Sequence, residues 1–378
     1  MTDRWIVFVS SREQLQKLQH ESDSVLSSED ALHELAFTDS ILGRHQVPPE
    51  HKGPQSEAFR VTVGVTKNNL RSNVSAMSGA FQKRITEAVA LEIAPRDVHE
   101  QGRGEWREVR LMPALLRIFT RVNLLAFFDE DQANRREVYN DVISFFWSCA
   151  RAFPVLELTP DFLIPLVKNM AMGWGVTRRK IYDFLVYVTN QVLANRKSSE
   201  FKKPQANGHI TQWIAEMTRL RDTAAIAKIS LGLLFASAFQ VPVIAQFCIY
   251  NICKHPQYLE RLRLEASKYR GVAFGSLNQE MPYLDSFVKE TARLSPGPIV
   301  SAPRKTMTSY TTPNGHHIPA GNWVAIPQAS LMRDENIWPR ASHFEGFRFV
   351  NEEKGTSESR FTHPSYEFPF WGAIQHAW

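Results

Sequence analysis

Cysteine is rare in this chain, which has three among its 378 residues. Cys149, Cys248 and Cys253 form neither a CxxC pair nor a cysteine and histidine spacing typical of zinc sites. So few cysteines exclude a small fold held together by disulfide bonds. They are typical of a protein in a reducing compartment, and we expect no disulfide partner.

A large excess of charge of one sign is also missing. The 44 basic and 39 acidic residues leave a net charge of +5, and both signs are mixed along the chain. This balance indicates an ordinary hydrated surface and gives no support for a nucleic-acid partner. The N-terminal region has one short apolar run, Trp5–Val9, which is too short for a signal peptide or a membrane span. That run predicts a strand followed by a helix.

Apolar residues with a helical period dominate the chain up to residue 295. Hydrophobic residues make up 43% of the sequence and charged residues 22%, which excludes a disordered chain. In Arg178–Lys197 the apolar residues recur every three or four positions, as they do along one face of a helix. Glu105–Phe128 and Glu137–Phe153 also predict helices, and the polar stretch Ser198–Gly208 predicts an exposed loop.

The segment Ile229–Cys253 contains no charged residue. Its length would allow it to cross a lipid bilayer. However, polar side chains are scattered through it and Pro242 lies near its middle, and polar groups are costly in hydrocarbon. We therefore favour a long helix buried in the centre of a soluble domain, with small residues that leave room for a flat ligand. A membrane span is the alternative.

After Pro296 the sequence becomes rich in turns and short strands. Pro313-Asn314-Gly315 predicts a tight turn, and the apolar run Trp323–Ile326 predicts a strand. The sequence thus predicts a mainly α fold with small β-sheets. Residues 1–295 are expected to be mostly helical, and residues 296–378 to be rich in turns and strands.

Two charged residues lie three positions apart on the predicted helix Tyr283–Leu294. Glu290 and Arg293 lie off the apolar stripe to which Leu284 and Phe287 belong. Neighbours at this spacing interact on a helix surface, and taken alone such a pair is most often an exposed ion pair.

A third charged residue, Arg348, stands between Phe347 and Phe349. If these rings are buried, the guanidinium needs a partner, and the carboxylate of Glu290 is a candidate. The alternative is that Arg348 simply lies on a surface strand.

Three segments, in this order, resemble the cytochrome P-450 family of haem-thiolate monooxygenases, most closely its filamentous-fungal members of secondary metabolism. Glu290–Arg293 matches the ExxR of the family's K helix, Pro339–Phe349 matches its PxxxxFxxFRF stretch, and Phe368–Trp378 resembles its haem loop. The resemblance implies the cytochrome P-450 fold, as a single domain over residues 1–378. It also implies that the acid and the arginine of ExxR form a network with Arg348.

The resemblance implies residues that bind the haem. Arg304 matches the arginine that binds one propionate, and Lys67 lies near the position of a residue for the other. A guanidinium can bind a carboxylate with two parallel hydrogen bonds, as that role requires. Phe370, Gly372 and His376 would belong to the haem loop.

The resemblance also places candidate catalytic residues on the central apolar segment. Gln240 takes a position that the family uses for proton delivery to bound oxygen, and Ser237 lies close enough in sequence to hold a water molecule. The expected walls of the substrate pocket are Phe235, Phe239, Gln240, Ile299 and Val300.

The sequence departs from the family pattern in the haem loop. Trp378 stands where the family has the cysteine that ligates the iron, so no metal ligand is assigned. An indole cannot replace a thiolate, because its nitrogen only donates hydrogen bonds. We expect a truncated chain without the family's N-terminal anchor and its haem-proximal helix, and therefore a compromised monooxygenase.

The family's cofactor is haem, and the missing thiolate argues against haem binding by this chain. The family's partners would be a lipophilic secondary metabolite (a terpenoid, alkaloid or polyketide) and an NADPH-dependent reductase. The alternative is a non-enzymatic binding protein that retains the hydrophobic pocket. A location in the cytoplasm or at the periphery of the endoplasmic reticulum is expected.

Overall fold

The computed structural model describes residues 5–47, 56–93, 108–196, 208–219, 222–269 and 281–372. The chain divides into two compact units. The first, here called the strand-rich unit, comprises Met1–Ala36, Val243–Val272 and Leu277–Trp378. The second, the helical unit, comprises Phe37–Pro242 and Ala273–Ser276. The fold is mainly helical with small β-sheets, as the sequence predicts. A single domain over residues 1–378 stays a prediction.

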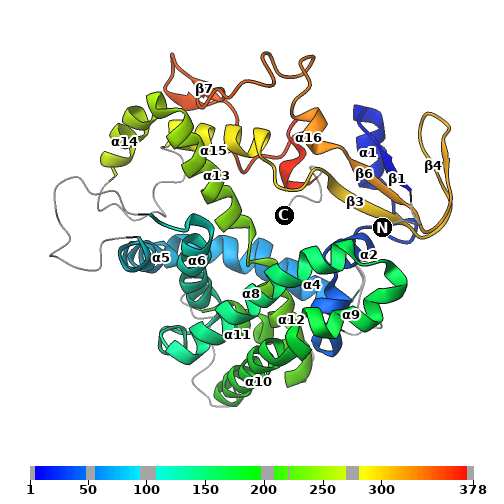
Figure 1. Cartoon of the computed structure of the whole chain (residues 1–378), viewed down its shortest axis with the longest axis vertical. Coiled ribbons are helices and arrows are strands. Elements are labelled where there is room, and N and C mark those ends of the chain that lie inside the picture. Colours follow the sequence, from blue (N-terminus) through cyan, green and yellow to red (C-terminus); the bar gives the residue numbers. More distant parts are fainter. Residues whose placement is uncertain are drawn as a thin grey trace. The chain divides into compact units, whose positions relative to one another are not determined.

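The helical unit consists of helices and turns throughout its described part (Figure 1). The predicted helix Arg178–Lys197 corresponds to α10, whose stripe residues Ile181, Leu185 and Val188 are buried against α8 and α12. The predicted loop Ser198–Gly208 lies outside the described residues, except for Gly208. The α-helices of this unit are α3 (Thr38–Ile41), α4 (Glu57–Gly64), α5 (Arg71–Glu92), α6 (Leu111–Phe127), α7 (Glu130–Ala133), α8 (Arg136–Leu158), α9 (Ile164–Ala171), α10 (Val176–Arg196), α11 (Ile210–Met217) and α12 (Thr223–Ala236).

Two predicted helices in this unit are confirmed with different ends. The residues from 108 to 110 are not helical, and α6 begins at Leu111. Helix α8 continues past Pro154, although a proline disfavours helical geometry at the residue before it. Ala152 and Leu156 are buried on either side of this proline, so packing holds both turns in place.

The strand-rich unit contains three small sheets. The order of the largest sheet is β1-β6-β3-β2, with β1 parallel to β6 and the other pairs antiparallel. Its strands are β1 (Ile6–Phe8), β2 (Leu26–Ser27), β3 (Ser301–Thr306) and β6 (Trp323–Ile326); β4 (Tyr310–Thr311) pairs with β5 (His317–Ile318), and β7 (Val350–Asn351) with β8 (Thr356–Ser357). Its α-helices are α1 (Arg12–His20), α2 (Ser28–Leu35), α14 (Leu259–Ser267), α15 (Pro282–Leu294), α16 (Gln328–Leu331) and most of α13 (Gln240–Lys254).

The N-terminal residues belong with the C-terminal strands. The predicted strand and helix are confirmed as β1 and α1, and β1 pairs with β6 from the far end of the sequence. The Ser11 hydroxyl accepts a hydrogen bond from the amide of Gln14 at 3.2 Å, which caps α1. Leu15 and Leu18 of α1 are buried in one core with residues of β6. The division into helical residues 1–295 and strand-rich residues 296–378 therefore does not hold for this N-terminal part.

The prediction of one long helix over Ile229–Cys253 is wrong. Helix α12 ends at Ala236 and α13 begins at Gln240, and Pro242 then lies in the first turn of α13. A continuous helix would need a hydrogen bond from the missing amide of this proline, whereas the first turn of a new helix does not. Nor is the segment buried throughout, because Tyr250 on α13 is 59% exposed.

Taken as one stretch, Thr223–Lys254 is long and apolar enough to cross a membrane; its most apolar window of 18 residues has a mean hydropathy of 1.8 and is 17% buried. Length and composition alone are weak evidence for a span, because core helices of soluble proteins meet the same criterion.

Candidate functional site

Helix α15 buries much of its polar side. Pro282 lies in its first turn, where the missing amide costs no helical hydrogen bond. Glu290 and Arg293 are both 0% exposed, whereas Leu284, which the sequence assigns to the buried apolar stripe, is 37% exposed. The interpretation of Glu290 and Arg293 as an exposed ion pair is therefore wrong. A buried charge must be paired, so the partners of these two residues decide the stability of this region.

Two arginines meet at one carboxylate in the strand-rich unit. Arg293 Nε and Nη2 donate to Glu290 Oε2 and Oε1 at 2.7 and 2.8 Å. Arg348 Nε donates to both oxygens of Glu290 at 3.1 Å. The side chain of Arg348 is 9% exposed, so the alternative of a free surface arginine is also wrong. We call Glu290, Arg293 and Arg348 the buried ion network.

The remaining N–H groups of both arginines bind backbone carbonyls, and Arg348 Nη2 also lies 3.2 Å from Glu345 Oε2. Arg293 Nη1 donates to the carbonyl of Ala341 at 2.7 Å. Arg348 Nη1 and Nη2 donate to the carbonyls of Pro339 and His343 at 2.6 and 3.2 Å. A buried polar network that is satisfied in this way holds its surroundings in one arrangement. It therefore ties the irregular segment around residues 339–348 to α15.

Aromatic packing explains why Arg348 points inward. The ring of Phe347 lies 4.8 Å from the rings of Tyr258 and Tyr283, and Phe349 is buried at an edge-to-face distance of 5.7 Å from Trp338. With both neighbouring rings packed, the guanidinium of Arg348 lies inside the unit and needs an acceptor. Glu290 provides it, as the sequence suggests.

Arg304 on β3 is a buried arginine with few partners. It is 6% exposed, and its guanidinium donates to the carbonyl of the preceding Pro303 at 3.2 Å. Burial lowers its pKa, and the charge of Asp23 opposes that shift. A bulge in the pairing of β3 with β6 lies just before it, at Ala302, which adopts a left-handed φ of 46°. Among the described residues no carboxylate forms an ion pair with Arg304, so a carboxylate of a ligand would satisfy it.

The described chain closes with part of the predicted haem loop. Phe370 stacks on Phe368 at 5.9 Å and contacts Phe361 at 5.4 Å. Gly372 has a φ of 92° and a ψ of −167°, a conformation open almost only to glycine. His376 and Trp378 lie outside the described residues, so their roles stay predictions.

The predicted site residues of the helical unit are not joined to one another. The Ser237 hydroxyl donates to the carbonyl of Leu234 at 2.8 Å, as often happens at the end of a helix. Gln240 and Lys67 are exposed, and neither side chain forms a hydrogen bond with another residue in the described ranges. Their predicted roles in proton delivery and propionate binding stay predictions.

The predicted pocket walls differ in exposure. In the helical unit, Phe235 is buried and stacks on Phe153 at 6.2 Å, and Phe239 packs against Phe146 at 6.1 Å. In the strand-rich unit, Ile299 is 71% exposed. Two residues predicted to line the substrate pocket, Phe235 and Phe239, thus pack against other aromatic rings of the helical unit.

The three cysteines do not match an iron ligand. All are free, and burial raises the pKa of the Cys149 thiol far above its usual value and that of Cys248 to about 11. Cys253 is exposed on α13. None of these three cysteines lies in the haem-loop segment that begins at Phe368. The buried guanidinium of Arg304, by contrast, fits a haem propionate.

Lys289 is a buried charge that the sequence does not reveal. Its side chain is 1% exposed, and Nζ donates to the hydroxyl of Ser359 at 2.6 Å and to the carbonyl of Arg360 at 3.2 Å. The ammonium lies 4.6 Å above the ring of Phe349 and 4.8 Å above that of Phe368. Burial lowers the pKa of Lys289 to about 8. Nothing local in the sequence separates this lysine from an ordinary exposed one on α15.

Comparison with known proteins agrees with this architecture. The family model "Cytochrome P450" matches residues 17–372. "Cytochrome P450 monooxygenase olcJ" of Penicillium canescens is 24% identical over 78% of this chain and 56% of its own length. "Cytochrome P450 monooxygenase 151" of Postia placenta is 23% identical over 100% of this chain and 74% of its own length. The chain spans about half the length of several of the curated relatives it matches.

Solved structures share the fold. "Retinoic acid bound cyanobacterial CYP120A1" is similar with a TM-score of 0.71 at 16% identity, over 100% of this chain and 78% of that one. A zebrafish cytochrome P450 structure with progesterone is similar with a TM-score of 0.67 at 16% identity, over 100% of this chain and 83% of that one. Such low identity speaks for the fold alone. Together with the family match over residues 17–372, it shows that this chain belongs to the cytochrome P450 family.

Proposed function

We propose that this chain carries the scaffold of a monooxygenase that oxidises a lipophilic secondary metabolite, with electrons from an NADPH-dependent reductase. The observation that carries this proposal is the buried ion network, which fixes the segment around residues 339–348 against α15. The names of several fungal relatives, which are called monooxygenases, also support the proposal. A terpenoid, alkaloid or polyketide substrate is the finer part of the proposal.

Haem, when bound, supplies the activation of molecular oxygen. The share of this chain would be to bind a propionate through Arg304 and to exclude water from the substrate. The guanidinium of Arg304 suits the first task because it is buried and lacks a carboxylate partner among the described residues. Phe370 and Gly372 would shape the start of the loop that faces the haem.

We further propose that residues 1–378 do not by themselves supply the thiolate that the reaction requires. Cys149 and Cys248 stay protonated near neutral pH because burial raises their pKa values, and a thiol is a poor metal ligand compared with a thiolate. Trp378 is expected at the position of the family's cysteine, and its indole cannot ligate iron.

The test is the carbon monoxide spectrum of the 378-residue polypeptide after it is loaded with haem and reduced. We expect no red-shifted Soret band of the thiolate-ligated kind. Cys248→Ser and Cys253→Ser variants serve as controls, because they show whether any band arises from these cysteines. Any thiolate band of the wild-type chain would contradict the proposal, and its loss in one variant would identify the cysteine responsible. Turnover of a lipophilic substrate with a reductase would also contradict it.

A second candidate is a binding protein that keeps the pocket without oxygen chemistry. It is favoured by one observation, that burial raises the pKa values of the Cys149 and Cys248 thiols and so disfavours their thiolates. Haem-free protein would then bind lipophilic compounds with a defined stoichiometry, measured by equilibrium dialysis. Binding that rises without saturation would count against this candidate.

A further inference from the structure

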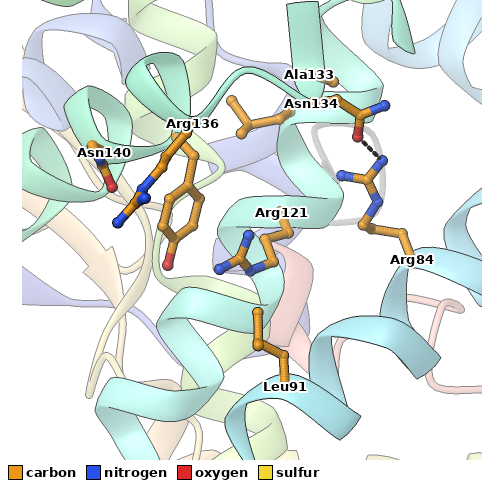
Figure 2. Close-up of a pocket in the computed structure, with 9 residues that line it drawn as sticks. Arg84, Leu91, Arg121, Ala133, Asn134, Arg136 and Asn140 are labelled. Atoms are coloured by element: carbon orange, nitrogen blue, oxygen red, sulfur yellow. Dashed lines mark hydrogen bonds between the residues drawn. The ribbon is translucent and has the colours of Figure 1, made fainter. Parts of the chain in front are cut away.

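A cavity of about 460 Å³ lies inside the helical unit, apart from every residue considered above (Figure 2). This volume is within the range of small-molecule sites. Three arginines from three helices line it: Arg84 from α5, Arg121 from α6 and Arg136 from α8. Within the part of the chain that the structure describes, its other lining residues are Leu91, Leu124, Ala133, Asn134, Tyr139 and Asn140, none of which carries a carboxylate.

Arg121 is the residue in this cavity that most needs a partner. Its side chain is 25% exposed, and its Nε is buried without a hydrogen-bond partner. Glu92 lies 3.6 Å from Arg121 Nη2, but the same carboxylate binds Arg117 Nε at 2.6 Å. The Arg121 guanidinium also lies 4.0 Å above the ring of Tyr139. Buried polar groups are normally satisfied, so an acceptor is missing beside this guanidinium.

Other hydrogen-bond donors line the cavity on either side of Arg121. Figure 2 shows Arg121 between Arg84 on one side and Arg136 on the other. Arg84 Nη2 donates to Asn134 Oδ1 at 2.6 Å, which leaves the amide group of Asn134 as a further donor. Arg136 is exposed and forms no ion pair within the described ranges. Burial raises the pKa of Tyr139, so its hydroxyl stays protonated near neutral pH and can also donate.

The charge of this lining selects the ligand. Two carboxylates lie next to the lining: Glu87 is 3.9 Å from Arg84 Nε, and Glu92 is 3.6 Å from Arg121 Nη2. Three guanidinium groups still leave an excess of positive charge that favours an anion, and planar guanidinium groups match the oxygens of a phosphate group well. The buried side chains of Leu124 and Ala133 add an apolar wall that a bare inorganic ion would leave uncovered. We propose that this cavity binds the phosphate monoester of a small organic ligand, with Arg84, Arg121 and Arg136 around the phosphate.

Binding of glycerol 3-phosphate to the full 378-residue chain, measured by isothermal titration calorimetry, tests this proposal. We expect saturable binding to one site per chain. Arg136→Ala should weaken it about tenfold or more, because a charge-assisted pair is lost. Arg135→Ala is the matched control, since Arg135 is the exposed neighbour at the start of α8 and does not line the cavity. It should change the affinity less than about twofold.

Two further arms identify the ligand's chemistry and source. Affinity should rise as the pH passes through about 6, where a phosphate monoester takes its second charge. Vesicles with phosphatidate, compared with pure phosphatidylcholine vesicles, distinguish a lipid headgroup from a soluble phosphate. Binding of either source that depends on Arg136 supports the proposal. Arg136→Lys keeps the positive charge but loses the two parallel N–H donors of the guanidinium, so it should give an intermediate affinity. This variant also serves as a control for a folding defect in Arg136→Ala.

The proposal fails on any of three results. The first is the absence of saturable binding of both glycerol 3-phosphate and phosphatidate vesicles. The second is an equal loss of affinity in Arg135→Ala and Arg136→Ala, which would indicate a diffuse attraction of anions to the surface. The third is unchanged affinity in a folded Arg136→Ala variant.

Discussion

Glu290→Ala is expected to destabilise the strand-rich unit by about 3–5 kcal/mol, because the change leaves the buried guanidinium of Arg293 without its carboxylate and removes one of the two carboxylates that pair with Arg348. Arg293 is 0% exposed and Arg348 is 9% exposed on its side chain, so water does not replace the lost partner at either site. Arg293 would keep only backbone carbonyls as acceptors, whereas Arg348 would also keep Glu345 Oε2, 3.2 Å from its Nη2. Since a typical domain is stable by only about 5–15 kcal/mol, a loss of this size removes a large share of the folding free energy.

Urea unfolding and amide hydrogen exchange of α15 would measure this loss. Glu335→Gln is the matched control, because Glu335 is exposed in the same unit and forms no ion pair in the described structure. It should change the unfolding free energy by less than about 0.5 kcal/mol. Arg348→Lys keeps the positive charge but loses the planar guanidinium with its several N–H donors. We therefore expect it to lower the unfolding free energy by less than Glu290→Ala does. A Glu290→Ala protein as stable as the control would show that the buried ion network does not hold this unit together.

Raising the pH from about 8 to 10.5 is expected to stabilise the wild-type protein relative to Lys289→Met, by up to roughly 3 kcal/mol. Burial lowers the pKa of Lys289 from 10.5 to about 8, so between these values the unfolded chain keeps a proton that the folded chain releases. Stability rises with pH wherever the unfolded state binds more protons. Below about pH 8 both states are charged and the cost of burying the ammonium remains in full. Asp285 opposes the shift without cancelling it.

The measurement is the difference in unfolding free energy between the wild type and Lys289→Met at pH 7, 8, 9 and 10. Other groups that titrate in this range, such as tyrosines, largely cancel in the difference. Lys354→Met, at an exposed position of the same unit, should show no such trend. A difference that stays constant from pH 7 to 10 would mean that Lys289 keeps an ordinary pKa in the folded protein.

Local patterns in the sequence predict much of the fold. The period of apolar residues locates α10, and the turn residues around Gly315, whose φ is 86°, locate the hairpin of β4 and β5. Both signals act between residues close in the chain, where backbone geometry and solvent exposure leave few choices. Pro242 is also visible in the sequence, and the structure places it in the first turn of α13, just after the break between α12 and α13.

Long-range contacts explain what the sequence could not predict. Their spacing alone predicts that Glu290 and Arg293 form an exposed ion pair. In the structure both side chains are buried, because α15 packs against segments far away in the sequence. The same holds for Lys289, whose environment is made by Ser359 and Arg360 from a distant part of the chain. The cavity between Arg84, Arg121 and Arg136 likewise exists only once three helices pack together.

By itself, the sequence determined the mainly helical class, the short C-terminal strands and the three segments that place this chain in its family. Only the tertiary structure decided which charges are buried and which meet, because that requires chain segments far apart to close on one another. Arg348 and Glu290 are 58 positions apart, and no local preference brings them within 3.1 Å. Packing of the intervening aromatic residues does so, and the desolvated charges then have to pair.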